Sequence, residues 1–250
     1  MLATDLDGTF IGDDAAMMDL WAELSGAGIQ VVFSTGRHLP SIQEFYARHG
    51  IERRAAACIC MVGSEIWTRD GSDYTRDESW SHHISAGWDR DAVAAILKQI
   101  PAAAPQAEEW QSDFKASYFL EEPASAHLQT IADELNDRGL NAKIVYSAGR
   151  FLDLLPQRSG KGGAVSWVAR SQGIAAGDVI TAGDTGNDLD MMRPELGFRS
   201  IAVGNAADEL RTAVEPNIYH AEANFAAGIR EGLARYGWLT PMPRGGEEAR

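Results

Sequence analysis

The first sixty residues alternate between short apolar runs and stretches whose apolar residues recur at helical spacing. Residues 1–4, 29–33 and 58–62 are apolar runs of strand length, and each is followed by polar or glycine residues. The stretches 17–27 and 41–49 lie between these runs and have the composition of amphipathic helices. This order of strands and helices predicts a parallel, doubly wound α/β sheet.

The pattern then changes. Residues 70–85 are polar and lack a clear helical period, so His82 and His83 are expected in a loop or at an edge. Beyond them, apolar residues recur at helical spacing near 93–100 and 128–135, with strand-like stretches at 115–120 and 142–147. Because this segment has its own apolar periodicity, we expect an inserted α/β cap domain.

The core pattern resumes after the cap. A helix is expected from Lys161, strands at 179–182, 200–203 and 217–220, and a last helix at 225–236. We therefore divide the chain into a first core part (1–76), an α/β cap (77–155), a second core part (156–238) and a flexible tail (239–250).

Paired carboxylates follow the first predicted strand. Asp5 and Asp7 are two positions apart, so both side chains are expected to face one cavity. One carboxylate can attack phosphorus as a nucleophile, and the other can act as a general acid and base. The alternative is an acidic turn after a strand, with Gly8 allowing the turn.

Two further strand ends carry groups that suit a phosphate. Ser34-Thr35-Gly36-Arg37 offers hydroxyls, a glycine amide and a guanidinium, although a capped strand-to-helix turn would have the same composition. Lys161 lies where a helix starts, so its ammonium and the helix N-terminus can address one anion. The alternative there is a solvated lysine. The Gly160-Lys161-Gly162 string does not fit a nucleotide P-loop, because Gly162 stands where Ser or Thr is needed.

A fourth cluster, Asp184, Asn187 and Asp188, follows the strand at 179–182. Carboxylates at a turn are oxygen ligands for a hard divalent cation, but a polar turn with a helix cap is the plain alternative. Ligands of open parallel sheets bind at the carboxyl ends of the strands, so all four clusters are expected to meet at one edge. Together they offer a nucleophile, an acid/base, phosphate donors and a metal site, which fits phosphoryl transfer.

Composition narrows the range of partners. The 250 residues include 36 acidic and 22 basic side chains, a net charge of −14, which argues against a nucleic acid or an anionic membrane as partner. No signal peptide or membrane-length apolar run is visible, so a cytoplasmic location is expected. Cys58 and Cys60 do not have zinc-site spacing and are expected to be buried, reduced thiols.

Four strings in this order resemble the motifs of the haloacid dehalogenase-like phosphatases: Asp-Leu-Asp-Gly-Thr (5–9), Ser-Thr-Gly-Arg (34–37), Gly-Lys-Gly (160–162) and Gly-Asp-Thr-Gly-Asn-Asp (183–188). Nearly the whole chain, Leu2 to Leu239, is similar to the sucrose-6-phosphate phosphatase branch, most distinctively at 62–66, 115–118 and 152–162. The resemblance implies a Rossmann-like parallel-sheet core with an α/β cap inserted between the second and third motifs.

The resemblance also implies roles for single residues. Asp5 would be the nucleophile that forms an aspartyl-phosphate, with Asp7 as general acid and base. Phosphate would be bound by Thr35, Gly36, Lys161 and Asn187. Magnesium would be held by Asp5, the Asp7 carbonyl and Asp184, with Asp188 in or near its shell.

The expected reaction is magnesium-dependent hydrolysis of a small-molecule sugar phosphate, sucrose 6-phosphate first. Sucrose phosphatases usually carry Asn where this chain has Gly8, whereas mannosylfructose-phosphate phosphatases carry Gly, so mannosylfructose-phosphate or another sugar phosphate is the alternative. A non-catalytic module that binds a glycosyltransferase, such as a synthase, is a second hypothesis. The carboxylates and Lys161 favour an enzyme. A phosphomutase is a third reading that motifs alone leave open.

Selectivity for a sugar needs groups that contact hydroxyls. The candidates are Glu65, at the end of the third core strand, and Lys115 and Ser117, on one face of a cap strand. The alternative for the cap pair is an exposed polar face of a small sheet. Tyr118 points to the opposite face and is expected in the core of the cap.

Overall fold

Eight strands form the core sheet, in the order β12-β11-β10-β1-β2-β3-β4-β5. The computed structural model describes residues 1–213 and 215–241. The strands are β1 (Leu2–Thr4), β2 (Val31–Ser34), β3 (Ala57–Cys60), β4 (Glu65–Asp70), β5 (Asp73–Arg76), β10 (Ile180–Gly183), β11 (Arg199–Ala202) and β12 (Ile218–His220). Neighbours from β12 to β3 pair in parallel, and β4 and β5 add an antiparallel edge. The predicted parallel α/β core is confirmed.

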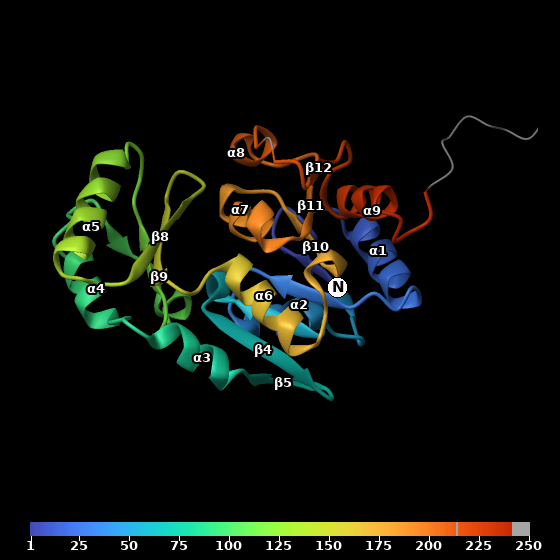
Figure 1. Cartoon of the computed structure of the whole chain (residues 1–250), viewed down its shortest axis with the longest axis horizontal. Helices are drawn as coiled ribbons and strands as arrows, with labels where there is room; N and C mark the ends of the chain where they lie inside the picture. The colour runs from blue at the N-terminus through green and yellow to red at the C-terminus, as the bar shows by residue number, and fades with distance from the viewer. Residues whose placement is uncertain (214, 242–250) are drawn as a thin grey trace, which may run out of the picture.

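Helices cover both faces of this sheet (Figure 1). One apolar cluster joins the sheet to α1 (Asp14–Gly26), α2 (Leu39–His49) and α9 (Phe225–Arg235). The other joins it to α3 (Glu78–Ser85), α6 (Lys161–Ser171), α7 (Leu189–Met192) and α8 (Asp208–Arg211). Side chains alternate across each strand, so Leu2 lies in the first cluster and Ala3 in the second. The fully buried strands explain the unbroken apolar runs of the sequence.

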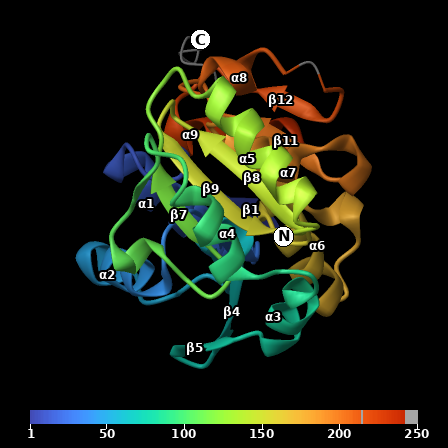
Figure 2. The ribbon, with the colours of Figure 1, turned by 90° about the vertical axis from the view of Figure 1, so that its left-hand side faces the viewer.

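The cap has a smaller antiparallel sheet, in the order β6-β7-β9-β8. Its elements are α4 (Arg90–Leu97), β6 (Ala104–Pro105), β7 (Ala116–Phe119), α5 (Ser125–Asp137), β8 (Ala142–Ser147) and β9 (Phe151–Pro156). Figure 2 shows α4 and α5 on the outer face of this sheet. They enclose an apolar cluster that includes Val93, Tyr118 and Leu154. The other face of the sheet is turned toward the core.

In the described part of the chain, short 3-10 turns connect these elements: η1 (Met61–Gly63), η2 (Glu108–Trp110), η3 (Ala176–Asp178), η4 (Gly186–Asp188) and η5 (Pro194–Leu196). Two of them, η1 and η4, lie at strand ends beside the polar clusters of the sequence. The third apolar run therefore ends as a strand at Cys60, and the expected continuation to residue 62 forms a turn.

The expectation for residues 70–85 was wrong. The β4–β5 hairpin continues into α3, and both His82 and His83 lie inside that helix. Asp77 caps α3 by accepting the N–H of Trp80, and Trp80 with Ile84 supplies an inward face too short to give a visible period. Because these two residues belong to a core cluster, the helix packs on the core although it follows the expected cap boundary at residue 77.

Other features of the chain match the sequence patterns. Cys58 and Cys60 are buried free thiols, as predicted. Leu239 packs against the first core cluster, whereas residues 242–250 of the expected flexible tail lie outside the described residues. None of the described helices combines the length and the apolar character that crossing a membrane would require.

Candidate active site

Asp5 and Asp7 leave the carboxyl end of β1 at the centre of the sheet. The N–H of Asp5 donates to the carbonyl of Ala182 on β10, which fixes the strand end. Asp5 is 6% exposed, whereas Asp7 has an exposed side chain. Gly8 has φ +79°, and a Cβ there would lie 2.3 Å from Asp184 Oδ2, so the turn after the carboxylates requires glycine.

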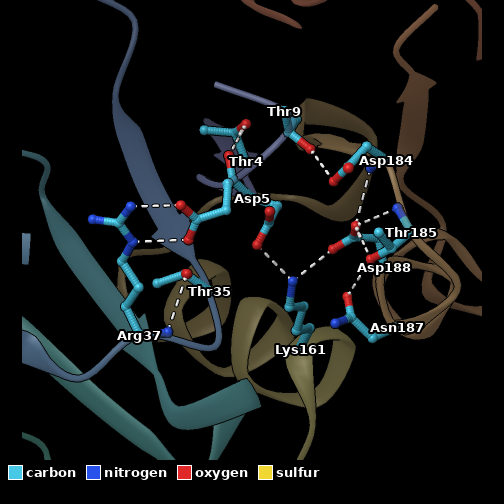
Figure 3. Close-up of polar contacts among 11 residues, drawn as sticks. Thr4, Asp5, Thr9, Thr35, Arg37, Lys161, Asp184, Thr185, Asn187 and Asp188 are labelled. Atoms are coloured by element: carbon cyan, nitrogen blue, oxygen red, sulfur yellow. Dashed lines mark hydrogen bonds and ion pairs between the residues drawn. The ribbon is translucent and has the colours of Figure 1, made fainter. Parts of the chain in front are cut away.

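The two carboxylates have different partners. Asp5 Oδ1 accepts a hydrogen bond from Lys161 Nζ at 2.7 Å (Figure 3). Asp7 accepts two from Arg37, one of them from Nε to Oδ2 at 2.8 Å. Asp7, but not Asp5, lines the large cavity described below. Asp5 is therefore held as a buried group and Asp7 as a group at the cavity wall.

Lys161 is the first residue of α6 and is 1% exposed. Its ammonium bridges two carboxylates, donating to Asp5 Oδ1 and, at 2.6 Å, to Asp188 Oδ1. Burial lowers the pKa of Lys161, but the charges of Asp188 and Asp5 outweigh burial and raise it. The lysine therefore stays charged beside the carboxylate of Asp5.

Asp188 shapes the loop after β10. Its Oδ2 accepts the N–H groups of Asp184 and Thr185, both at 3.0 Å, and the Thr185 hydroxyl lies 3.3 Å away. A Cβ on Gly183 would lie 2.4 Å from the Cβ of Asp188, so glycine lets the side chain fold back under the loop. With Oδ1 taken by Lys161, both oxygens of Asp188 already accept hydrogen bonds.

Asp5, Asp184 and Asp188 each offer an oxygen, and these oxygens all lie within 4.8 Å of one another. Thr9 donates to Asp184 Oδ1 at 2.8 Å. Within residues 1–213 and 215–241, no donor reaches Asp5 Oδ2 or Asp184 Oδ2. The donor set therefore fits a hard cation, with Asp5 and Asp184 as the carboxylates free to bind it and Asp188 as the residue that holds the loop.

The pKa values of the carboxylates in this cluster also favour a bound cation. Burial, with the charges of Asp188 and Asp184, raises the pKa of Asp5 to about 8 even against the attraction of Lys161. Burial and Asp188 raise the pKa of Asp184 to about 6. One ammonium does not balance three buried carboxylates, and a divalent cation would favour the ionised forms.

The second motif lies on the other side of Asp5. Thr35 is 1% exposed, its N–H donates to Ile59, and its hydroxyl accepts the N–H of Arg37 at 3.2 Å. Gly36 and Asn187 both line the large cavity. The four residues expected to bind phosphate therefore lie at the same edge of the sheet: Thr35 and Gly36 after β2, Lys161 at the start of α6 and Asn187 in η4.

A strained turn, which the sequence did not reveal, braces this motif. Met61, Val62 and Gly63 have φ values of 53°, 59° and 85°. The N–H of Met61 donates to Arg37 and that of Val62 to Thr35, each at 3.0 Å. A β-branched valine at positive φ is costly, and such strain is retained where the surroundings determine the conformation. In this strained conformation Val62 lines the cavity.

A cavity of about 630 Å³ lies between core and cap. Its core side carries Asp7, Arg37, Glu44, Arg48 and His49; its cap side carries Gln106, Trp110, Lys115, Phe119, Phe151 and Asp153. Charged groups and aromatic rings thus face each other across the space. This combination suits a polar ligand with hydroxyls and apolar ring faces.

The three expected sugar-binding residues lie in different settings. Lys115 lines the cavity, with Nζ 3.4 Å from Asp153 Oδ1. Ser117 is fully buried and donates to Asp153 Oδ1 at 2.6 Å, with the Trp110 carbonyl 2.9 Å away. Glu65 begins β4, accepts from Trp67 Nε1 at 3.0 Å and is not among the residues that line the cavity.

Asp153 was missed by the sequence reasoning. It is 7% exposed, borders the cavity and is contacted by both Lys115 and Ser117. The available signal was a single carboxylate inside the otherwise apolar run Phe151–Pro156. Such a charge is costly to bury unless it is paired or used.

Comparisons with known proteins match almost the whole chain. A family model described as sucrose-6F-phosphate phosphohydrolase matches residues 1–237. Mannosylfructose-phosphate phosphatase of Agrobacterium fabrum is 30% identical over 95% of this chain and 96% of its own length. Sucrose-phosphatase 2 of Nicotiana tabacum is 29% identical over 93% of this chain, but the match spans 58% of that longer protein.

Among solved structures, the sucrose-phosphatase of Synechocystis, in complex with sucrose and phosphate, superposes with a TM-score of 0.87. It is 30% identical, over 96% of this chain and 98% of that one. Haloacid dehalogenase-like hydrolases with lower identity share the fold. The chain therefore belongs to the sucrose-6F-phosphate phosphohydrolase family, on the haloacid dehalogenase-like fold.

Proposed function

We propose that this sugar-phosphate phosphatase hydrolyses the phosphate ester of a disaccharide, with sucrose 6-phosphate as the preferred substrate and magnesium as the cation. The single observation that carries the proposal is the position of Asp5. It lies buried against Lys161, next to a cavity that core and cap build together. The family and the sucrose and phosphate bound in the Synechocystis neighbour support the substrate class.

The proposed reaction has two steps. A carboxylate oxygen of Asp5 attacks phosphorus while the ester bond to the sugar breaks, and Asp7, which enters this step protonated, gives its proton to the leaving sugar oxygen and becomes a carboxylate. Water then attacks phosphorus, Asp7 takes a proton from it, and the bond between Asp5 and phosphorus breaks to release phosphate. Magnesium held by Asp5 and Asp184 would supply positive charge to the phosphate.

Other residues of the chain position and stabilise the reacting groups. Lys161 keeps a full charge beside Asp5 and can balance charge on the phosphate oxygens. The Thr35 hydroxyl, the Gly36 amide and the Asn187 side chain would add donors. Asp7 has an exposed side chain at the cavity wall and is directed there by Arg37, so it can reach the leaving oxygen.

Recognition of the sugar is assigned to the cap face of the cavity. Lys115 can donate to sugar hydroxyls, and Asp153 can accept from them. Phe119 and Phe151, with ring centroids 5.9 Å apart, offer apolar faces to a sugar ring. The Ser117 hydroxyl donates its hydrogen bond to Asp153. We therefore assign Ser117 the role of holding that carboxylate and not of contacting the sugar.

Phosphate release across a panel of sugar phosphates tests the proposal. With magnesium present, we expect sucrose 6-phosphate first, mannosylfructose-phosphate second, and fructose 6-phosphate and p-nitrophenyl phosphate far behind. A preference for mannosylfructose-phosphate would identify that compound as the substrate, in line with the glycine at position 8. If no sugar phosphate released phosphate, the proposal would be contradicted. The hypothesis of a non-catalytic module that binds a glycosyltransferase would then be favoured. Transfer of phosphate to a second sugar would indicate a mutase.

A further inference from the structure

Asp190, on α7, contacts both the cap and the helix that carries Lys161. Its Oδ2 accepts the N–H of Gly162, in the first turn of α6, at 2.9 Å. Its Oδ1 lies 3.3 Å from Nζ of Lys143, on the cap strand β8. Lys143 also donates to the carbonyl of Ser159 at 2.8 Å, on the segment that leads from β9 into α6. One carboxylate thus joins core, cap and connecting segment.

The backbone around this contact has no room for a side chain. Gly160 has φ +115°, and a Cβ there would lie 2.5 Å from Asp190 Oδ2 and 2.6 Å from Lys143 Nζ. A Cβ on Gly162 would lie 2.0 Å from the Asp190 carbonyl. The two glycines that flank Lys161 therefore let Asp190 and Lys143 approach the start of α6.

Lys161 depends on this first turn. It lies between the two glycines, is almost fully buried, and donates hydrogen bonds to Asp5 and Asp188 from its Nζ atom. The N-terminal amides of a helix lack partners inside the helix, and a carboxylate that accepts from one of them stabilises the turn. Asp190 supplies that acceptor for Gly162.

We propose that Asp190 is a positioning residue that couples closure of the cap to the placement of Lys161. With the cap closed, Lys143 holds Asp190 and Ser159 on both sides of the turn. When the cap opens, Lys143 leaves, and the first turn of α6 loses one of its restraints. The coupling follows from the contacts; only its effect on turnover rests on the proposed function.

The chain supplies a matched control. Arg193 Nη2 lies 3.4 Å from the same Oδ1 atom of Asp190, but Arg193 and Asp190 both belong to the core. Arg193→Met therefore removes a cation from Asp190 without removing, among the described residues, a hydrogen bond or ion pair to the cap. Lys143→Met removes the cap contact, and Asp190→Asn keeps an acceptor for Gly162 while losing the charge.

Steady-state kinetics with magnesium measure the effect on turnover. For sucrose 6-phosphate, we expect Lys143→Met and Asp190→Asn to lower kcat/KM by about fivefold or more, and Arg193→Met by less than about twofold. For p-nitrophenyl phosphate, which is too small to need a closed cap, Lys143→Met is expected to change kcat/KM by less than about twofold. Asp190→Ala removes the acceptor as well and is expected to lower activity on both substrates.

Hydrogen–deuterium exchange separates the coupling from the catalytic proposal. Lys143→Met is expected to speed amide exchange in residues 161–164, although Lys143 does not itself contact those amides, while Arg193→Met leaves exchange as in the parent protein. Equal exchange and equal kinetics in the Lys143→Met and Arg193→Met variants would overturn the inference. If the parent protein released no phosphate from sugar phosphates, the proposed function would fail, and exchange would still decide the coupling.

Discussion

The guanidinium of Arg37 holds the carboxylate of Asp7 at two points, with Nε donating to Oδ2 at 2.8 Å and Nη2 donating to Oδ1. Asp7 is the proposed acid and base, so its direction depends on an arginine from a different strand end. A planar fork matches a carboxylate in a way that a lysine ammonium does not.

We therefore expect Arg37→Lys to lower kcat by roughly tenfold and change KM little, and Asp7→Asn to cost about 10²–10⁴-fold in kcat. The double variant provides the check. If Arg37 acts through Asp7, Arg37→Lys adds almost nothing once Asp7 is Asn. Additive losses would mean that Arg37 binds the substrate directly.

Asp5→Asn is expected to fold and to lose turnover by at least about 10⁴-fold, because the amide does not attack phosphorus. Trapping of labelled phosphate on acid-quenched enzyme measures the covalent step. We expect label on the parent protein and on the Asp19→Asn control, an exposed change on α1, and none on Asp5→Asn. Near-normal turnover by Asp5→Asn would exclude the covalent mechanism.

Stability of the metal-free protein is expected to fall as the pH rises. Burial raises the pKa of Asp184 from 3.8 to about 6 and that of Asp5 from 3.8 to about 8. Between the unfolded and folded values the folded state binds more protons, so the stability that these groups contribute below about pH 4 is lost as the pH rises through the folded values.

Magnesium should reverse this loss. Thermal unfolding with and without magnesium is expected to show a gain in Tm that is larger at about pH 7.5 than at about pH 5, since the ligands must be ionised. EDTA should abolish activity, magnesium should restore it, and calcium should substitute poorly. An equal magnesium effect at both pH values, or one that survives in Asp184→Asn, would remove this carboxylate from the cation site.

Asp153→Asn should weaken recognition of the disaccharide. A hydrogen bond to a charged group contributes about 1.5–3 kcal/mol, so kcat/KM for sucrose 6-phosphate is expected to fall by about 10- to 100-fold. Lys115→Ala should act in the same direction, and p-nitrophenyl phosphate should be hydrolysed almost as before. Asp113→Asn, an exposed carboxylate of the cap, serves as control. Equal losses on both substrates would show that the pair supports the cap fold.

Gly63→Ala should destabilise the protein strongly. Gly63 has φ +85°, and a Cβ would lie 2.2 Å from the carbonyl carbon of Gly160. Gly28→Ala is the matched control, because Gly28 also has positive φ but its Cβ would meet nothing within 4 Å. Urea unfolding should give about 1–2 kcal/mol for Gly28→Ala, the usual left-handed penalty, and clearly more for Gly63→Ala. Similar losses of unfolding free energy in the two variants would mean that the backbone at Gly160 shifts to make room for the added Cβ.

The sequence predicted features that depend on local pattern. Apolar runs marked the parallel strands, and glycine-flanked carboxylates marked the strand ends, so Asp5, Lys161 and Asp184 were expected at one edge before their distances were known. The different roles proposed for Asp184 and Asp188 could not be predicted, because they depend on which oxygens already accept hydrogen bonds.

Features that depend on pairing across the fold escaped prediction. Asp153 was hidden in an apolar run, since its partners Lys115 and Ser117 lie more than thirty residues earlier. The left-handed conformation of Val62 could not be predicted from a valine, which rarely adopts it. Contacts with the second motif impose this conformation. Long-range contacts, not local propensity, decide both.

The position of β1 has a consequence for the order in which the chain folds. This strand pairs with β2, only about thirty residues away, and with β10, which is synthesised long after the cap. During synthesis the cap sequence emerges before β10, the second partner of β1, has been made, so the cap, with its local contacts and its own apolar cluster, can fold while the core is incomplete. The proposed catalytic edge, which brings Asp5 next to Asp184 and Lys161, then forms only after β10 and the loop that follows it have left the ribosome.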